Sequence, residues 1–346
     1  MAILERIQAS DHEQLLFTHD RDTGLRAIIA VHNTTRGPGL GGIRIREYDS
    51  EADAVDDVLR LSQAMSYKNA CAGLDFGGAK AVILAPLPAD RRAAFLAMGR
   101  IVEGLAGRYV ATEDMGMTEA DIAVLNEVTA FAVGRSRDAG GSGDPSPHTA
   151  LGVFVGMRAT ARTAGLGDDM RGLSVAVQGC GKVGLGLIAR LIDAGARVIA
   201  ADTDAAGVAA ARDLGADIVA TDQILAVEAD VLAPCAVGGV LNEATIPTLR
   251  CRAVAGGANN QLATEADADR LAARGIVYAP DFVINAGGVI NVGDELAPGG
   301  YSPERVRDRV LAIEQTLAQI LAESRQSRQS TAGIAVIRAQ RLLGNG

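Results

Sequence analysis

The sequence has no tryptophan, few aromatic residues and almost no lysine, and each shortage narrows what the protein can be. Aromatics make up 3% of the 346 residues, which argues against a stacking surface for single-stranded nucleic acid. The formal net charge is -9 and arginine is scattered along the chain, so a dedicated nucleic-acid binder is not expected. No apolar run reaches about 18 residues and the first residues lack a signal-peptide pattern, so we expect no membrane span and no secretion.

Cysteine and histidine are scarce too, with four of each. No two cysteines form a CxxC motif, and no cysteine lies at zinc-ligand spacing from a histidine, so we expect no metal site. The cysteines are Cys71, Cys180, Cys235 and Cys251. We interpret them as small buried thiols of a protein in the reducing cytoplasm.

Apolar residues, by contrast, make up 48% of the chain, and its length suggests two domains. In the first region we expect strands over 25–31 and 81–84, a Gly-rich turn over 37–42, and helices over 51–67, 89–107 and 118–127. A short apolar strand also runs from Tyr109 toward Glu113. The cluster AGGSGDPSP at 139–147 has the composition of a loop, and we expect an inter-domain hinge there.

The second region alternates strands with helix-length segments. We expect strands over 174–179, 197–202, 217–220, 230–235, 253–258 and 276–281, with helices over 183–194 and 204–214 and another from Ser302. Such alternation is typical of a parallel, doubly wound sheet. The fold class that we predict is therefore α/β with two domains.

A glycine-rich loop lies between the first strand and the first helix of this second region. Gly179, Gly181 and Gly184 form a GxGxxG pattern, whose glycines allow close backbone approach to a pyrophosphate at a helix N-terminus. Asp202 ends the next strand, where a carboxylate binds the ribose hydroxyls and repels a 2′-phosphate. The pattern favours NAD over NADP, although a tight turn without a ligand would use the same glycines.

Lysine is the rarest charged residue: three of the 33 Lys and Arg residues are lysine, namely Lys68, Lys80 and Lys182. Two of them lie in SYKNACAGLDFGGAKAVI, among glycines that let backbone approach a small ligand. Lysine loses its proton when it is desolvated or lies near another cation, and arginine does not, so a catalytic base is one reason to keep lysine. Two exposed surface lysines would be the ordinary alternative. Asp114, at a strand end before a glycine, is placed for proton transfer in a cleft, although such a residue also serves as a turn cap.

Eight segments, in one order from residue 37 to 296, resemble the amino-acid dehydrogenases of the leucine, valine and phenylalanine group, which are relatives of glutamate dehydrogenase. These segments are GPGLGGIR (37–44), YKNACAGLDFGGAKAVI (67–83), ATEDMG (111–116), DPSPHTALGV (144–153), AVQGCGKVG (176–184), DVLAPCAVGG (230–239), AGGANNQL (255–262) and APDFVINAGGVINVGDEL (279–296).

The resemblance implies a substrate-binding, catalytic and oligomerisation domain at 1–138 and a Rossmann-type NAD domain at 139–346, with a cleft between them. It implies that the final stretch of about 20 residues packs back on the first domain. It also implies reversible oxidative deamination of an L-amino acid to a 2-oxo acid and ammonia by a homo-oligomer, anywhere from a dimer to an octamer. Besides these small molecules, we expect no nucleic-acid or membrane partner.

Roles for individual residues follow from the same resemblance. Lys68 anchors the substrate carboxylate, Lys80 activates the attacking water, Asp114 exchanges a proton with the substrate nitrogen, and Asn260 helps to bind the carboxylate. A second ammonium near Lys80 would lower its pKa and make it a usable base. Thr149 and Asn285 orient the nicotinamide carboxamide. The implied cofactor-binding set is Gly179, Gly181, Lys182, Val183, Gly184, Asp202, Thr149, Ala236, Asn259 and Asn285.

The family's side-chain pocket is mostly aliphatic in this chain, which favours a branched-chain substrate. The pocket positions are Leu40, Gly41, Met65, Thr112, Val289 and Val292. The chain departs from the family pattern at Thr112, where leucine dehydrogenases have Ala, at Ala79, at Lys182, and at His148 in the expected hinge loop. Phenylalanine remains an alternative substrate. Hydroxy-acid oxidation, which usually needs a His base, and a non-catalytic NAD-binding regulator are the rival functions.

Overall fold

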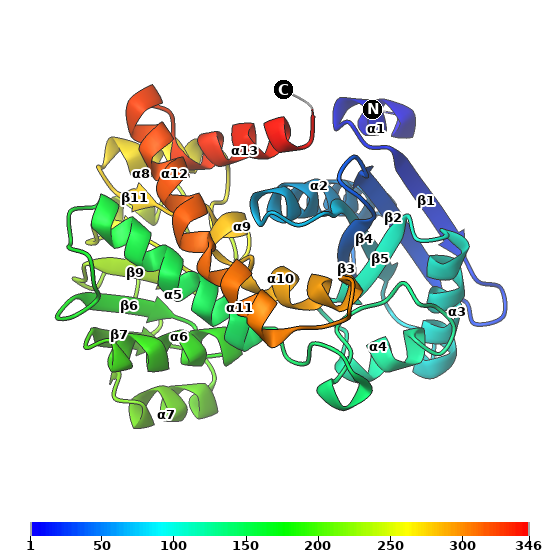
Figure 1. Ribbon diagram of the computed structural model, residues 1–346, viewed down its shortest axis with the longest axis horizontal. Helices are drawn as coiled ribbons and strands as arrows, with labels where there is room; N and C mark the ends of the chain where they lie inside the picture. Colours follow the sequence, from blue (N-terminus) through cyan, green and yellow to red (C-terminus); the bar gives the residue numbers. More distant parts are fainter. Residues whose placement is uncertain (1, 345–346) are drawn as a thin grey trace. The chain divides into compact units, whose positions relative to one another are not determined.

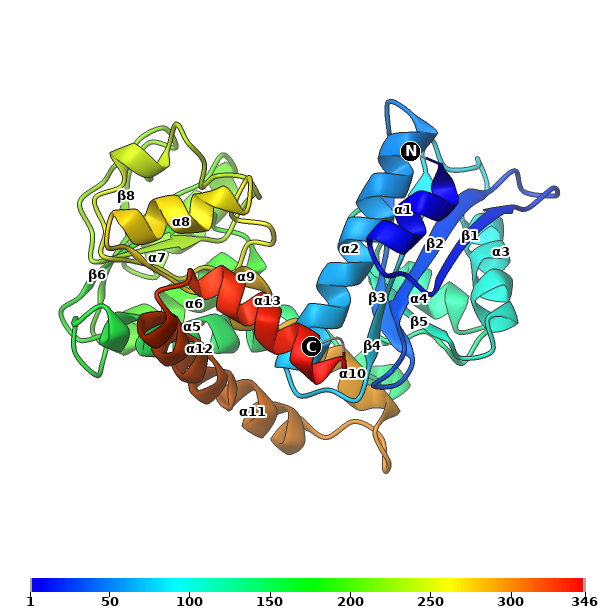
Figure 2. The ribbon, with the colours of Figure 1, turned by 90° about the horizontal axis from the view of Figure 1, so that it is seen from above.

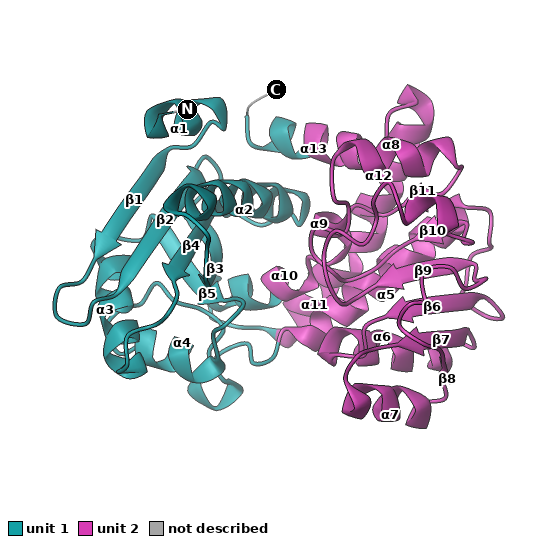
Figure 3. Ribbon diagram, turned by 180° about the vertical axis from the view of Figure 1, so that it is seen from behind, with its two compact units in different colours: residues 1–144, 291–302, 339–346 teal, residues 145–290, 303–338 magenta. Residues whose placement is uncertain are grey.

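The computed structural model describes residues 2–344 and divides into two compact units (Figure 3). Unit 1 comprises Met1–Asp144, Asn291–Ser302 and Ala339–Gly346, and unit 2 comprises Pro145–Ile290 and Pro303–Arg338. The chain therefore leaves unit 1, builds most of unit 2, and returns to unit 1 twice. No helix in the described part of the chain is long and apolar enough to cross a membrane.

Unit 1 is built on a five-stranded sheet with the order β1-β2-β4-β3-β5 (Figure 1). Its elements are α1 (Ile3–Ala9), β1 (Gln14–His19), β2 (Arg26–Asn33), β3 (Gly39–Arg46), α2 (Glu51–Cys71), β4 (Gly77–Leu84), α3 (Arg91–Gly104), β5 (Tyr109–Glu113), α4 (Glu119–Leu125), η1 (Arg137–Ala139) and η3 (Asp294–Leu296). Strand β4 lies between antiparallel β2 and parallel β3, and β3 pairs in parallel with β5.

Helix α2 covers one face of this sheet, and α3 and α4 cover the other (Figures 1 and 2). Alternate residues of each strand point to opposite faces. Ile28 and Val82 accordingly pack with α2, whereas Ile29 and Ala81 pack with α3 and α4. Because Lys80 lies between Ala79 and Ala81 on β4, its side chain belongs to the α2 face.

The turn expected over 37–42 is wrong, because Gly39–Arg46 forms β3. Glycine is needed here for close packing between strands: a Cβ on Gly41 would lie 1.8 Å from the carbonyl oxygen of Ala79. Glycines in a strand interior often mark such an approach of another backbone.

Unit 2 contains a six-stranded parallel sheet with the order β11-β10-β9-β6-β7-β8. Its elements are α5 (Ser146–Thr163), β6 (Ser174–Gln178), α6 (Lys182–Asp193), β7 (Arg197–Ala201), α7 (Ala205–Asp213), β8 (Asp217–Ile218), β9 (Val231–Pro234), η2 (Ile246–Thr248), β10 (Ala253–Val254), α8 (Ala266–Ala273), β11 (Val277–Tyr278), α9 (Asp281–Ile284), α11 (Pro303–Leu311) and α12 (Ile313–Ser327); α10 (Gly287–Gly293) and α13 (Thr331–Leu342) are shared with unit 1. Counted along the chain, this is the strand order 3-2-1-4-5-6 of dinucleotide-binding sheets. The predicted α/β class and parallel sheet are confirmed.

Two local expectations at the start and end of unit 2 need correction. His148 lies in helix α5, which begins at Ser146, and not in a loop. Pro145 precedes the helix and a second proline lies in its first turn, where the missing N–H has no intrahelical partner to lose. The helix expected from Ser302 is two helices, α11 and α12, which Ala312 separates.

Candidate active site

Buried Lys80 and half-buried Asp114 form an ion pair in unit 1. Lys80 lies on β4 and is 5% exposed, and Asp114 follows the last residue of β5. The Nζ atom of Lys80 lies 2.7 Å from Oδ2 of Asp114. Strand β4 is hydrogen-bonded on both sides, so the lysine is carried by backbone that is held firmly. The structure thus brings together the two residues that the sequence assigns to proton transfer.

The surroundings act on this pair in opposite ways. Burial lowers the pKa of Lys80, the Asp114 carboxylate raises it, and the guanidinium of Arg44 lowers it again. The net direction is downward, toward a lysine that can serve as a base. Burial raises the pKa of Asp114, but the charges of Lys80 and Arg44 outweigh it, so the pKa of Asp114 is lowered and the group stays a carboxylate.

Arg44 and Gly42 are the site residues that sequence reasoning missed. Nε of Arg44 lies 3.1 Å from the same Asp114 oxygen that Lys80 contacts. A Cβ on Gly42 would lie 2.7 Å from Cβ of Asp114 and 3.2 Å from Nζ of Lys80. Both belong to β3, which was expected to be a turn up to residue 42, and the alternation along the strand could have found Arg44 two positions beyond Gly42.

Other predicted substrate residues of unit 1 lie around this strand. A Cβ on Gly41 would lie 3.3 Å from Cγ of Met65, and one on Gly134 would lie 3.3 Å from Oγ1 of Thr112 and 3.9 Å from Cγ1 of Val292. Leu40 is fully buried and lies close to Gly293. Lys68 is half-buried near the end of α2. The remaining predicted substrate residues, Asn260 and Val289, belong to unit 2.

The glycine-rich loop of unit 2 lies where the strand order reverses, between β6 and β9. Gly179 has φ +107°, and a Cβ there would lie 2.8 Å from the backbone N of Ala236, which follows β9. A Cβ on Gly184 would lie 2.0 Å from the carbonyl oxygen of Gly179, so α6 begins tightly against the loop. Gly181, the N-cap of α6, has no atom within 4 Å of an added Cβ, and the helix lacks a side-chain cap. This open, uncapped helix start suits a pyrophosphate.

Asp202 follows β7 and closes the loop from the other side. Its carboxylate accepts hydrogen bonds from the backbone N–H groups of Cys180 and Asp204. Burial raises the pKa of Asp202, but these and neighbouring hydrogen bonds outweigh it and lower the pKa. Asp202 therefore presents a negative charge beside the loop.

A second group of predicted cofactor residues lies around Asn285, which is 5% exposed. Its Nδ2 donates to Oδ1 of Asn259 at 2.8 Å, whereas its own Oδ1 is buried without a hydrogen-bond partner. A Cβ on Gly288 would lie 2.8 Å from Oγ1 of Thr149, so backbone there runs close to that hydroxyl. An unpaired buried acceptor fits the amide of a nicotinamide, because burying it without a donor is unfavourable. Together with the glycine-rich loop, these residues fit a nicotinamide dinucleotide.

The other predicted residues of unit 2 are placed as follows. Lys182 and Val183 begin α6, and Asn260 has φ +51°.

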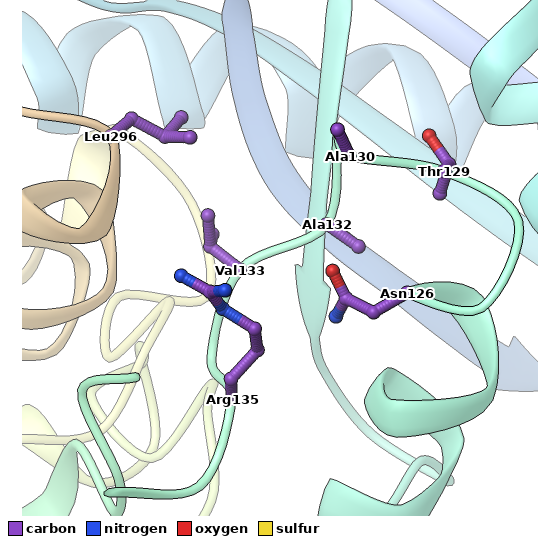
Figure 4. Close-up of a pocket in the computed structure, with 7 residues that line it drawn as sticks. All are labelled: Asn126, Thr129, Ala130, Ala132, Val133, Arg135 and Leu296. Atoms are coloured by element: carbon purple, nitrogen blue, oxygen red, sulfur yellow. The ribbon is translucent and has the colours of Figure 1, made fainter. Parts of the chain in front are cut away.

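A separate pocket of about 340 Å³ lies elsewhere on unit 1 (Figure 4). None of the predicted site residues lines it. Its lining residues are Asn126, Thr129, Ala130, Ala132, Val133, Arg135 and Leu296. Nε of Arg135 already lies 3.0 Å from the buried carboxylate of Glu295, so we assign no role in the reaction to this pocket.

Comparisons with known proteins agree with the geometry of both units. Residues 12–130 match the family model described as Glu/Leu/Phe/Val dehydrogenase, dimerisation domain. Residues 140–221 and 208–342 match the model described as Glutamate/Leucine/Phenylalanine/Valine dehydrogenase.

Individual relatives cover nearly the whole chain. This chain is 46% identical over 333 residues to a leucine dehydrogenase of Bacillus cereus. The aligned region covers 96% of this chain and 90% of that protein. This chain is also 44% identical over 320 residues to a valine dehydrogenase of Streptomyces coelicolor, with coverage of 91% and 87%. The crystal structure of L-tryptophan dehydrogenase from Nostoc punctiforme superposes with a TM-score of 0.87 at 38% identity, covering 99% of this chain and 98% of that one.

Proposed function

This chain belongs to the glutamate/leucine/phenylalanine/valine dehydrogenase family of NAD(P)-dependent amino-acid dehydrogenases, and from that premise we propose that it deaminates a branched-chain L-amino acid to the 2-oxo acid and ammonia with NAD as hydride acceptor. The observation that carries the proposal is the ion pair of buried Lys80 and half-buried Asp114, whose Nζ and Oδ2 atoms lie 2.7 Å apart. Two adjacent groups that exchange protons suit a reaction that passes through an imine.

We propose the following proton transfers for deamination. Asp114 accepts a proton from the substrate ammonium. NAD, which the glycine-rich loop, Asp202 and Asn285 would hold, would supply the acceptor for the hydride on Cα, and the substrate would then carry an iminium group. Lys80, in its neutral form, takes a proton from the water that attacks the iminium carbon. Asp114 then returns its proton to the nitrogen, the C–N bond breaks and ammonia leaves. The remaining hydroxyl gives its proton to the carboxylate of Asp114, which completes the 2-oxo acid. Lys68 and Asn260 hold the substrate carboxylate.

The preference for NAD rests on Asp202. Its carboxylate is fixed by two backbone N–H groups beside the glycine-rich loop, and no arginine occurs at 203–207 to bind a 2′-phosphate. A fixed carboxylate at this position repels the 2′-phosphate of NADP and accepts hydrogen bonds from the ribose hydroxyls of NAD. Asn285 and Thr149 orient the nicotinamide carboxamide in this proposal.

The branched-chain preference rests on the aliphatic character of the pocket positions. Leu40, Met65, Val289 and Val292 are apolar, and only Thr112 brings a hydroxyl. One methylene changes discrimination by only about 1–3 kcal/mol, so leucine, isoleucine and valine are all expected to react. The first test is NADH formation by purified protein at alkaline pH with leucine, isoleucine, valine and phenylalanine. Absence of NADH with all four would refute the proposal, and a clear preference for phenylalanine would replace the branched-chain assignment.

We also propose that the chain forms a homo-oligomer. The proposed boundary along the chain between the substrate-binding and NAD domains is at residues 138–139, whereas the first segment of compact unit 1 ends at Asp144. The match to a family model described as a dimerisation domain supports the first point. Light scattering of the purified protein would give its mass in solution, and a mass of 35.6 kDa would contradict oligomerisation.

A further inference from the structure

We infer that Arg44 is a positioning residue that fixes the carboxylate of Asp114 and supplies a permanent positive charge beside Lys80. The inference rests on the proposed function of the Lys80 and Asp114 pair. Arg44 lies on β3 with its side chain 11% exposed, and its Nε and the Nζ of Lys80 reach the same oxygen of Asp114, at 3.1 and 2.7 Å. One carboxylate oxygen is therefore held by two cations from two neighbouring strands.

The other end of the guanidinium is anchored on helix α2. Nη1 of Arg44 lies 3.2 Å from Oδ2 of Asp57, whose side chain is 9% exposed. Tyr48 donates its hydroxyl to the same oxygen at 2.8 Å, and Arg60 lies 2.8 Å from Oδ1. Burial raises the pKa of Asp57, but these hydrogen bonds and the charge of Arg44 outweigh it and lower the pKa. Asp57 thus remains a fixed carboxylate that holds Arg44 in place.

A lysine at position 44 could not do the same work. The planar guanidinium donates in two directions at once and does not deprotonate, whereas one ammonium is a single point of charge. Arg44 therefore couples Asp57 to Asp114.

The positive charge of Arg44 lowers the pKa of Lys80. The charged groups that act on Lys80 are Asp114 and Asp57, which raise its pKa, and Arg44, which lowers it. Removing Arg44 leaves both carboxylates to act on the ammonium, so the pKa of Lys80 rises. Because deamination needs the neutral amine, the acid limb of the pH profile of kcat moves to higher pH.

The experiment compares Arg44→Gln and Arg44→Lys with wild type and with the control Arg92→Gln. Arg92 lies on α3 and forms an exposed ion pair with Glu127, with 2.6 Å between Nη2 and Oε2. We expect Arg44→Gln to lower kcat by about tenfold or more and to move the acid limb up by about one pH unit. Arg44→Lys should lower kcat with little movement of the limb, because the charge remains. The control Arg92→Gln should keep kcat within about twofold of the wild-type value and leave the acid limb at the wild-type pH.

A second readout does not depend on turnover. Trace acetylation with acetic anhydride, followed by peptide mass spectrometry across a pH series, reports the pKa of each lysine amine, and this chain has only three lysines. The Lys80 peptide should titrate at higher pH in Arg44→Gln than in wild type. If circular dichroism shows that Arg44→Gln does not fold, Arg44→Lys provides the test. For that variant we expect a lower kcat and an acid limb at the wild-type pH.

The outcomes separate the two proposals. Arg44→Gln could fold and remain active while its acid limb and its Lys80 titration lie at the same pH as in wild type. That result overturns the inference, even if kcat falls. An acid limb that moves to higher pH in Arg44→Lys overturns it as well. Wild type that forms no NADH with any amino acid of the panel overturns the proposed function, which is a different result from wild-type turnover with unaltered Arg44 variants.

Discussion

Gly42→Ala should disable the enzyme by displacing Asp114, and the structure gives the size of the displacement. The added Cβ would lie 2.7 Å from Cβ of Asp114, 3.0 Å from the carbonyl oxygen of Glu113 and 3.2 Å from Nζ of Lys80. Gly42 has no positive φ, so alanine fits its backbone and the effect comes from contact alone. Strand β3 does not move easily, because β4 and β5 pair with it on both sides, and Gly42 lies opposite Thr112 of β5.

The magnitude follows from the missing space. Carbon atoms rest about 3.5–4.0 Å apart, so Asp114 must move by roughly 1 Å to admit the methyl group. A misplacement of about 1 Å in a reacting pair lowers turnover on the order of 100-fold, which equals about 2.7 kcal/mol of activation free energy. The same overpacking should reduce the free energy of unfolding by about 1–3 kcal/mol, which most folded proteins survive.

The assay measures kcat by NADH absorbance with the best amino acid of the panel, and NAD affinity by titration. Gly104→Ala is the matched control, since Gly104 ends α3 and an added Cβ there meets nothing within 4 Å. We expect kcat to fall about 100-fold in Gly42→Ala and to stay within about twofold in Gly104→Ala, with NAD affinity unchanged in both. A folded Gly42→Ala that keeps more than about half of the wild-type kcat would refute the reasoning.

Three further predictions concern other parts of the chain. Lys80→Ala should lower kcat by about three orders of magnitude or more while calorimetry still detects NAD binding, and retained turnover would remove Lys80 from its role as base. Asp202→Ala should raise the ratio of kcat/KM for NADP to that for NAD by about tenfold or more, and an unchanged ratio would dissociate Asp202 from cofactor choice. Burial lowers the pKa of His32 from 6.5 to about 3, so the unfolded chain binds more protons below pH 6.5 and stability is lost progressively as the pH falls from there toward 3. Urea unfolding at pH 7 and pH 5 should therefore show His32→Asn losing about 2 kcal/mol less than wild type over this interval, and equal losses would count against the burial argument.

Local pattern was enough to predict much of the fold of each unit. The glycine-rich loop and its flanking strand and helix were expected at 174–194 and are found as β6 and α6, because their apolar spacing and glycines are consistent with a single structure. Strand β3 was not predictable in this way. Gly39 and Gly41 read locally as a turn, and they form a strand only because β4 and β5 pair on both sides of it.

The same contrast holds for the site. Lys80 could be found from composition, since lysine was retained at three positions of a chain that otherwise uses arginine. Arg44 could not be singled out by composition, because it is one of 30 arginines, and its importance arises only from distances to Asp114 and Asp57 across three elements. Residue choice identifies groups that must titrate, whereas groups that hold them in place emerge only when the strands are assembled.

Unit 1 is assembled from three separate segments of the chain. This affects the order in which the protein is completed during synthesis. The buried Glu295 side chain accepts hydrogen bonds from the backbone N–H groups of Gly134, Arg135 and Ser142. Glu295 lies 161 residues after Gly134. At about 5–20 residues per second, the ribosome needs roughly 8–30 s to add it. During that interval the donors around Gly134 are left to water. The unit that begins first is therefore finished only after most of unit 2 has emerged, and a nascent chain halted before residue 295 should be cleaved by protease near 134–142.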